Sequence, residues 1–83
     1  MIPLSAPSSL WDSVKAELRQ SVSQTDFESW FANIHAVGIE GDTLVLRAPS
    51  VLAEAWVNSN FGEIIRRQVT LAAGRSMSYR LTA

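Results

Sequence analysis

The chain has 83 residues, a formal net charge of −1 and no cysteine. This length predicts one small domain. The charge gives no basic footprint for tight nucleic-acid binding, and the lack of cysteine excludes disulfides, thiolate metal sites and thiol catalysis. No apolar run approaches the roughly 18 residues of a membrane span, and the start lacks the pattern of a signal peptide. We therefore expect a cytoplasmic protein without membrane contact.

Two prolines among small polar residues predict a flexible tail at 1–8, followed by a single domain at 9–83. Ser9 and Asp12 are spaced as in a capping box, which satisfies free N–H groups at a helix start. The apolar residues that follow recur at helical spacing, and they predict a first helix at about 10–21.

A second capping box, Ser23–Asp26, predicts a second helix. Phe27, Trp30, Phe31 and Ile34 then recur at the spacing of one helix face. Such rings on a short amphipathic helix are more often core than a stacking platform for bases. We expect them to form mainly core, and Asp26 beside them to be the better candidate for a contact.

The period then changes to that of strands, with a hairpin predicted from strands near 34–39 and 43–48. Alternation places Leu44 and Leu46 on one face of the second strand. The sequence Gly38–Gly41 matches the Gly-x-x-Gly loop of KH domains, but it contains a glutamate and lies in the hairpin, so we interpret it as a turn.

Ser50 can cap a third helix, whose apolar residues include Leu52, Ala55 and Trp56. Asn58–Asn60 interrupts the pattern, which predicts two helices, or one with a break near residue 59. Gly74 fits a helix-terminating position. Alternating residues at 77–81 predict a last strand. The order α-α-β-β-α-(α)-β predicts an α+β domain with helices packed on a three-stranded sheet.

Catalytic motifs are missing from the sequence. It has neither a phosphate-binding Gly-x-x-x-x-Gly-Lys loop nor a dinucleotide-binding motif. His35 is the only histidine, which gives a zinc site or a catalytic triad almost no support. We expect no enzymatic activity, cofactor, metal or small-molecule substrate.

Several stretches together resemble the N-terminal domain of the bacterial replication initiator DnaA. They are "SLW", "TDFESWF", "GDTLVLRAPS", "AEAWVNSNF", "EII" and a glycine before the last strand, and they span Ser9 to Leu81. The resemblance implies a compact KH-like fold. It also implies a protein-interaction module of replication initiation, which self-associates, docks the replicative helicase and regulatory proteins, and weakly contacts single-stranded DNA.

The resemblance implies five site residues. Leu10 and Trp11 match a self-association pair, which requires exposure that the sequence leaves open. Asp26, Ser50 and Leu52 match positions that contact the helicase or regulators, although Ser50 is shorter than the usual asparagine and Leu52 lacks a ring. Asp26 and Leu52 would be neighbours if the starts of the second and third helices packed together.

Two alternatives remain open. One is a KH-like single-stranded nucleic-acid binder, which would use basic residues; the candidates are Arg47, Arg66 and Arg67. The other is the same module reused as an adaptor in another protein.

Overall fold

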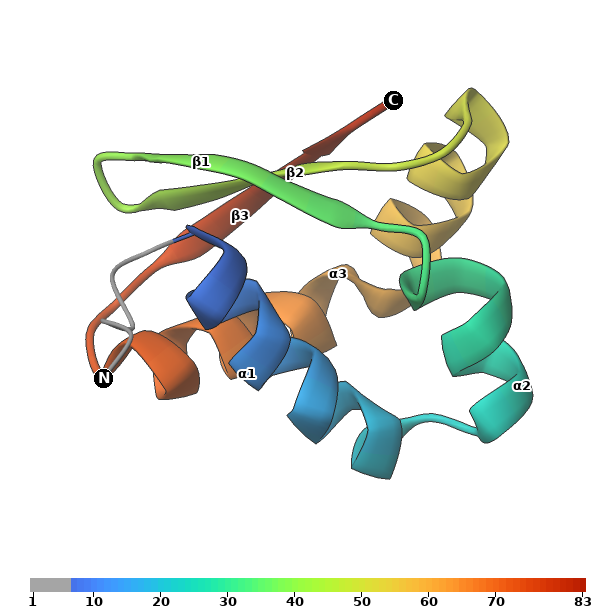
Figure 1. Ribbon diagram of the computed structural model, residues 1–83, viewed down its shortest axis with the longest axis horizontal. Coiled ribbons are helices and arrows are strands. Elements are labelled where there is room, and N and C mark those ends of the chain that lie inside the picture. The colour runs from blue at the N-terminus through green and yellow to red at the C-terminus, as the bar shows by residue number, and fades with distance from the viewer. Residues whose placement is uncertain (1–6) are drawn as a thin grey trace.

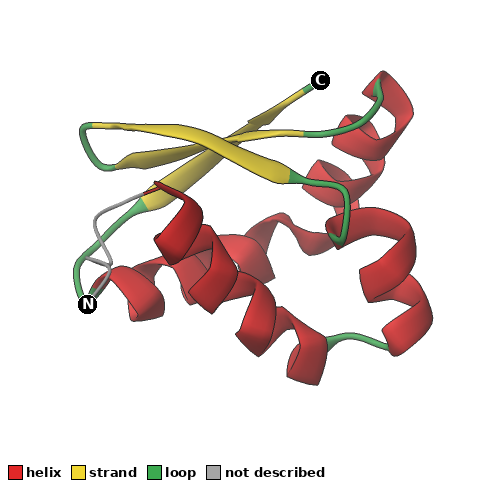
Figure 2. Cartoon of the chain, viewed as in Figure 1, coloured by secondary structure: helices red, strands yellow, loops and turns green. Residues whose placement is uncertain are grey.

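The computed structural model describes residues 7–83, in which helices lie on one side of a three-stranded sheet (Figures 1 and 2). The element order confirms the α+β prediction. In chain order the elements are α1 (Pro7–Ser21), α2 (Gln24–Asp26), the π-helical segment η1 (Phe27–Phe31), β1 (His35–Glu40), β2 (Thr43–Arg47), α3 (Val51–Ala73) and β3 (Ser78–Thr82).

The sheet has the order β1-β2-β3. β1 pairs antiparallel with β2 through a turn whose Gly41 has φ of 59°, a left-handed conformation that favours glycine. The Gly-x-x-Gly sequence is therefore part of a hairpin, as expected. β2 pairs parallel with β3, and α3 supplies the long crossover that parallel strands need. Leu44 and Leu46 are buried in one core cluster with side chains of the helices.

The helix α1 begins at Pro7, inside the predicted tail and before the predicted start at about residue 10. Proline is common at the first helical position because its missing N–H has no partner there in any case. Ser9 is therefore a first-turn residue and not the cap, so this part of the prediction was wrong. Residues 1–6 lie outside the described residues.

The second helical segment begins as predicted. The Ser23 Oγ accepts a hydrogen bond from the Asp26 N–H at 3.1 Å. The segment then widens, since the Ala32 N–H donates to the Phe27 carbonyl at 3.0 Å, which is the i to i+5 pattern of a π-helix. Phe27 and Phe31 are buried. These two rings are core, as expected, whereas Trp30 is only partly buried.

The helix α3 is continuous over 23 residues, so the predicted break near residue 59 was wrong. The asparagines that suggested it have partners compatible with a helix: the Asn60 Nδ2 donates to the Trp56 carbonyl at 2.9 Å, and Asn58 Oδ1 accepts from the Tyr79 hydroxyl at 2.7 Å. Gly62 lies under that hydroxyl, where an added Cβ would be 2.9 Å from the oxygen. The interruption in the sequence therefore reflects packing of β3 on α3.

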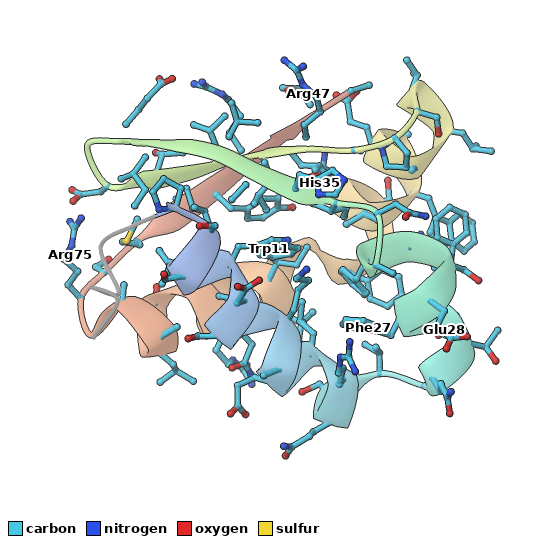
Figure 3. All side chains as sticks on the ribbon, viewed as in Figure 1. Trp11, Phe27, Glu28, His35, Arg47 and Arg75 are labelled. Carbon is cyan, nitrogen blue, oxygen red and sulfur yellow. The ribbon has the colours of Figure 1, made fainter. Side chains whose placement is uncertain are left out.

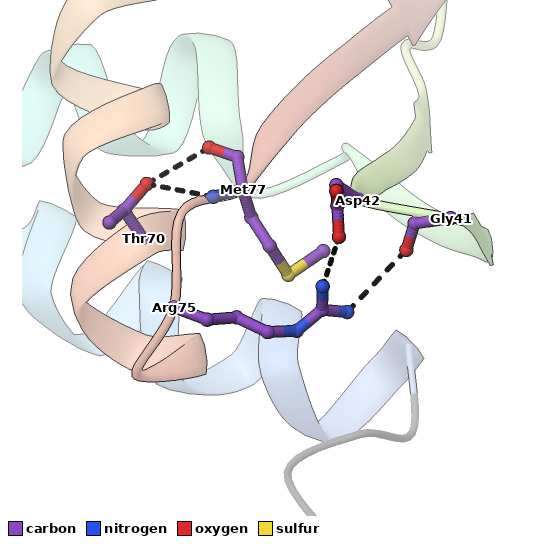
Figure 4. A network of polar contacts seen from close by, with 5 residues as sticks. All are labelled: Gly41, Asp42, Thr70, Arg75 and Met77. Carbon is purple, nitrogen blue, oxygen red and sulfur yellow. Dashed lines mark hydrogen bonds and ion pairs between the residues drawn. The ribbon is translucent and has the colours of Figure 1, made fainter.

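The end of α3 is fixed by a polar network (Figure 4). Gly74 has φ of 72° and ends the helix as predicted. The Thr70 hydroxyl donates to the Met77 carbonyl at 2.9 Å and accepts from the Met77 N–H at 3.2 Å. Arg75 pairs with Asp42 in the hairpin turn. These contacts hold the start of β3 against α3 and the hairpin.

Candidate protein-binding surface

Two tryptophans from different elements form the centre of an exposed apolar surface. The rings of Trp30 in η1 and Trp56 in α3 stack with centroids 5.3 Å apart and planes at 24°. Trp56 is 46% exposed, and Leu52, one turn earlier on α3, is 70% exposed. We call Trp30, Leu52 and Trp56 the tryptophan patch.

The local fold explains why the patch faces solvent. The Ser50 Oγ accepts from the Ala53 N–H at 3.1 Å and caps α3, as predicted. From this start, Ala53 and Val57 are buried and form the core stripe. Leu52 and Trp56 lie about 60–100° away from that stripe around the helix. The apolar residues noted in the sequence of this helix, Leu52, Ala55 and Trp56, are therefore exposed and lie outside the core stripe.

Asp26 lies one helical turn before Trp30 along α2 and η1. Glu28, two residues before Trp30, is exposed on another side of η1 (Figure 3). Figure 1 places α2 and the first turn of α3 at opposite ends of η1. Asp26 precedes Trp30 by four residues, and Leu52 precedes Trp56 by four. Each therefore lies about one helical turn from one of the two stacked rings.

The two residues expected to mediate self-association are in the core. Leu10 is 1% exposed and Trp11 is 2% exposed. The Trp11 Nε1–H donates to the Ile34 carbonyl at 2.8 Å and so ties α1 to the start of β1 (Figure 3). The exposure that this pair would need to contact a second copy is absent from the structure.

The three arginines expected to contact nucleic acid do not form one track. Arg47 is paired in register with Thr82, at the end of β3, and projects from the sheet in Figure 3. Arg66 and Arg67 border a hollow that Met77 lines at the start of β3. Thr82, beside Arg47, and Met77, beside Arg66 and Arg67, are five residues apart along the chain, which is about 17 Å in an extended strand.

A hollow that the sequence did not indicate lies between α1 and η1. Its volume is about 460 Å³, and the Arg19 guanidinium stands 4.7 Å from the centre of the Phe27 ring at its wall. Glu28 also lines it. Arg19 and Phe27 are eight residues apart on different helices, so no periodic pattern could have signalled the contact.

Among the titratable groups of residues 7–83, Tyr79 has a shifted pKa, because burial raises the pKa of its hydroxyl. Residues 7–83 contain no group of three metal-ligating side chains. No helix in this part of the chain has the length and apolar character needed to cross a membrane.

The fold and the exposed patch are typical of a small α+β protein-interaction domain. Residues 8–70 match the family model of the DnaA N-terminal domain, and the chain belongs to this family. The structure is similar to a chain in the crystal structure of a HobA-DnaA (domain I-II) complex from Helicobacter pylori, with a TM-score of 0.75 and 16% identity. The similarity covers 89% of this chain and 95% of that chain, and at this identity it shows the shared fold.

Proposed function

We propose that this domain is a protein-interaction module of DNA replication initiation, and that its tryptophan patch docks initiation regulators and the replicative helicase. The observation that carries the proposal is the exposure of Leu52 and Trp56 beside Trp30 in a domain of the DnaA N-terminal family. The similar fold in a complex of HobA with DnaA supports an interaction role.

The physical properties of the patch suit such a contact. Tryptophans and a neighbouring large aliphatic side chain are typical interface anchors, and an apolar centre with a charged rim is the usual anatomy. Leu52 can supply about 1.5–3 kcal/mol when a partner covers it. Asp26 forms no ion pair within residues 7–83, so its carboxylate is available to a basic partner group.

Ser50 has a more limited part in this proposal. Its oxygen already accepts the Ala53 N–H, which leaves its O–H group as a donor toward a partner. A shorter side chain than the family's usual asparagine reaches less far. We therefore expect Leu52 and Trp56 to contribute more binding energy than Ser50.

An NMR titration of the isotope-labelled 83-residue chain with the replicative helicase of the same organism tests the docking surface. We expect shifts at Leu52, Trp56 and the Trp30 indole, whereas Leu71, which is similarly exposed on another part of α3, stays unchanged. Shifts confined to other surfaces, or no shifts from an intact domain, would contradict the proposal. A parallel titration with an initiation regulator separates the two partners.

Single-stranded DNA contact is the second candidate function. Arg66 and Arg67 border one hollow, and Arg47 lies on the open face of the sheet, which supports local contact more than a continuous track. Such binding should fall steeply as salt rises. Fluorescence anisotropy with labelled oligonucleotides checks this, and Arg66→Ala with Arg67→Ala should weaken it. Affinity that is independent of salt and of these arginines would exclude it.

Self-association also belongs to the proposed function. It needs a surface other than the buried Leu10 and Trp11.

A further inference from the structure

We propose that a second copy of this chain docks around Leu71, on the C-terminal half of α3 and the adjoining part of α1. This rests on the proposed self-association of the domain and gives it a surface. Leu71 is 66% exposed, although it is a large aliphatic residue on a helix whose opposite side is core. The occupant follows from the shape and charge around it.

Leu71 is a ridge between two hollows. One hollow, of about 310 Å³, lies between α3 and the start of β3. The other, of about 390 Å³, lies between α3 and α1. Leu71 lines both. The first is otherwise lined by Glu63, Arg66, Arg67, Thr70, Ser76 and Met77, and the second by Ser13, Glu17, Gln68 and Ala72.

The wall of the first hollow is fixed before any partner arrives. Thr70 makes two hydrogen bonds with the backbone of Met77, at 2.9 and 3.2 Å (Figure 4). These bonds hold the start of β3 at a set position beside α3. A preformed hollow lowers the ordering cost of accepting an apolar side chain. The surface therefore carries both a protruding leucine and recesses beside it.

The two flanks of Leu71 have opposite charge. Arg66 and Arg67 outweigh Glu63 on one flank, and Glu17 is the charged residue lining the other. Within residues 7–83 the structure shows no ion pair for any of these four side chains. A two-fold axis that runs along α3 past Leu71 would bring the arginine flank of each copy opposite the Glu17 flank of the other.

This self-complementarity selects a second copy as the occupant. In a two-fold interface the same patch serves both partners, so it must present both shapes and both charges. A nucleic acid would match only the arginine flank and would be repelled by Glu17. Stable interfaces usually bury about 1,200–2,000 Å². Because this patch is centred on a single exposed leucine, we expect a weak dimer, with Kd of roughly 0.1–1 mM.

The proposed dimer leaves the tryptophan patch free. Leu52 and Leu71 are 19 residues apart on α3, which corresponds to about 28 Å along a straight helix. Figure 1 shows α3 running from the upper right, beside η1, to the lower left, beside the start of α1. Dimerisation and partner docking therefore use opposite ends of the same helix.

Sedimentation equilibrium of the 83-residue chain, from about 10 µM to about 2 mM, tests the proposal. We expect Leu71→Ser to weaken the dimer at least about tenfold, and Leu52→Ser, a similarly exposed control, to leave it unchanged. Arg67→Glu and Glu17→Arg should each weaken it, whereas the double variant should recover much of the wild-type affinity. A dimer unaffected by Leu71→Ser, or a wild-type chain monomeric throughout this range, would overturn the proposal.

The charge reversal distinguishes this interface from non-specific apolar association, because only residues that meet across it can rescue each other. The double variant failing to recover affinity would also count against the two-fold arrangement. Failure of this proposal is separate from failure of the proposed partner docking, since the helicase titration reads shifts at Leu52 and Trp56 whether or not a dimer forms.

Discussion

Replacing Trp11 by phenylalanine separates a core role from a role in self-association. The change removes the Nε1–H donor and leaves the buried Ile34 carbonyl without its 2.8 Å hydrogen bond, which costs about 1–3 kcal/mol. The smaller ring leaves a cavity that costs about 1 kcal/mol more. We therefore expect the free energy of unfolding to fall by about 2–4 kcal/mol, out of a total of about 4–12 kcal/mol for a chain of this length.

Urea and thermal unfolding followed by circular dichroism measure this loss. The melting temperature should fall by about 10–25 °C. The matched control is Trp56→Phe, because Trp56 is 46% exposed and its replacement should cost less than about 1.5 kcal/mol. In sedimentation equilibrium, folded Trp11→Phe should dimerise as the wild type does. A variant of unchanged stability that no longer self-associates would refute this reasoning, since Trp11 would then have to be a surface contact.

Three further predictions follow from the packing of α3. Gly62→Ala should leave the free energy of unfolding nearly unchanged in the wild type, because the gain in helix propensity of about 1 kcal/mol is offset by displacing the Tyr79 hydroxyl from Asn58. In a Tyr79→Phe background, which lacks this hydroxyl, the same change should stabilise the domain by about 1 kcal/mol in urea unfolding. Equal effects in both backgrounds would disprove the clash. Tyr79 is the only tyrosine, so the tyrosine absorbance of the protein should titrate above pH 10, with the raised pKa that burial causes. The contribution of the neutral, buried hydroxyl to the free energy of unfolding is present below pH 10 and is lost as pH rises through the raised pKa. Tyr79→Phe should remove this loss of stability, and a titration at the ordinary pKa would contradict the prediction. Ser50→Ala should cost about 1 kcal/mol in urea unfolding through loss of the cap on Ala53, whereas Ser50→Gly, which helix starts tolerate better, should cost only a few tenths.

The sequence predicted the elements whose signals are local. Ser23 and Ser50 cap helices because their hydroxyls accept from the N–H three residues later. Gly74 ends α3 because it can adopt the left-handed conformation. Alternation placed Leu44 and Leu46 on one face of a strand, and both are buried in the structure. Each of these features depends on residues within one turn or one strand, which a single sequence displays directly.

The features that the sequence missed depend on contacts between distant elements. The continuity of α3 through its asparagines depends on Tyr79, 21 residues away from Asn58. Trp56 stacks on Trp30, which belongs to a different element. The burial of Trp11 depends on the Ile34 carbonyl, 23 residues away. No helical or strand period encodes such pairings.

The residue roles implied by the resemblance agree with the observed exposure at some positions and not at others. Leu52 is exposed where the resemblance implies a partner contact, whereas Leu10 and Trp11 are buried where it implies self-association. A matching residue type therefore does not establish a matching environment. Burial and hydrogen bonding decide which of these positions a partner can reach.

The affinity of the replicative helicase for this domain is the most direct test of the proposed docking surface. Isothermal titration calorimetry with the wild type, Leu52→Ser and Leu71→Ser compares two changes at similarly exposed leucines. We expect Leu52→Ser to raise Kd at least about tenfold and Leu71→Ser to change it less than about twofold. Equal Kd values for the wild type and Leu52→Ser, or no helicase binding by the folded wild type, would contradict docking at the tryptophan patch.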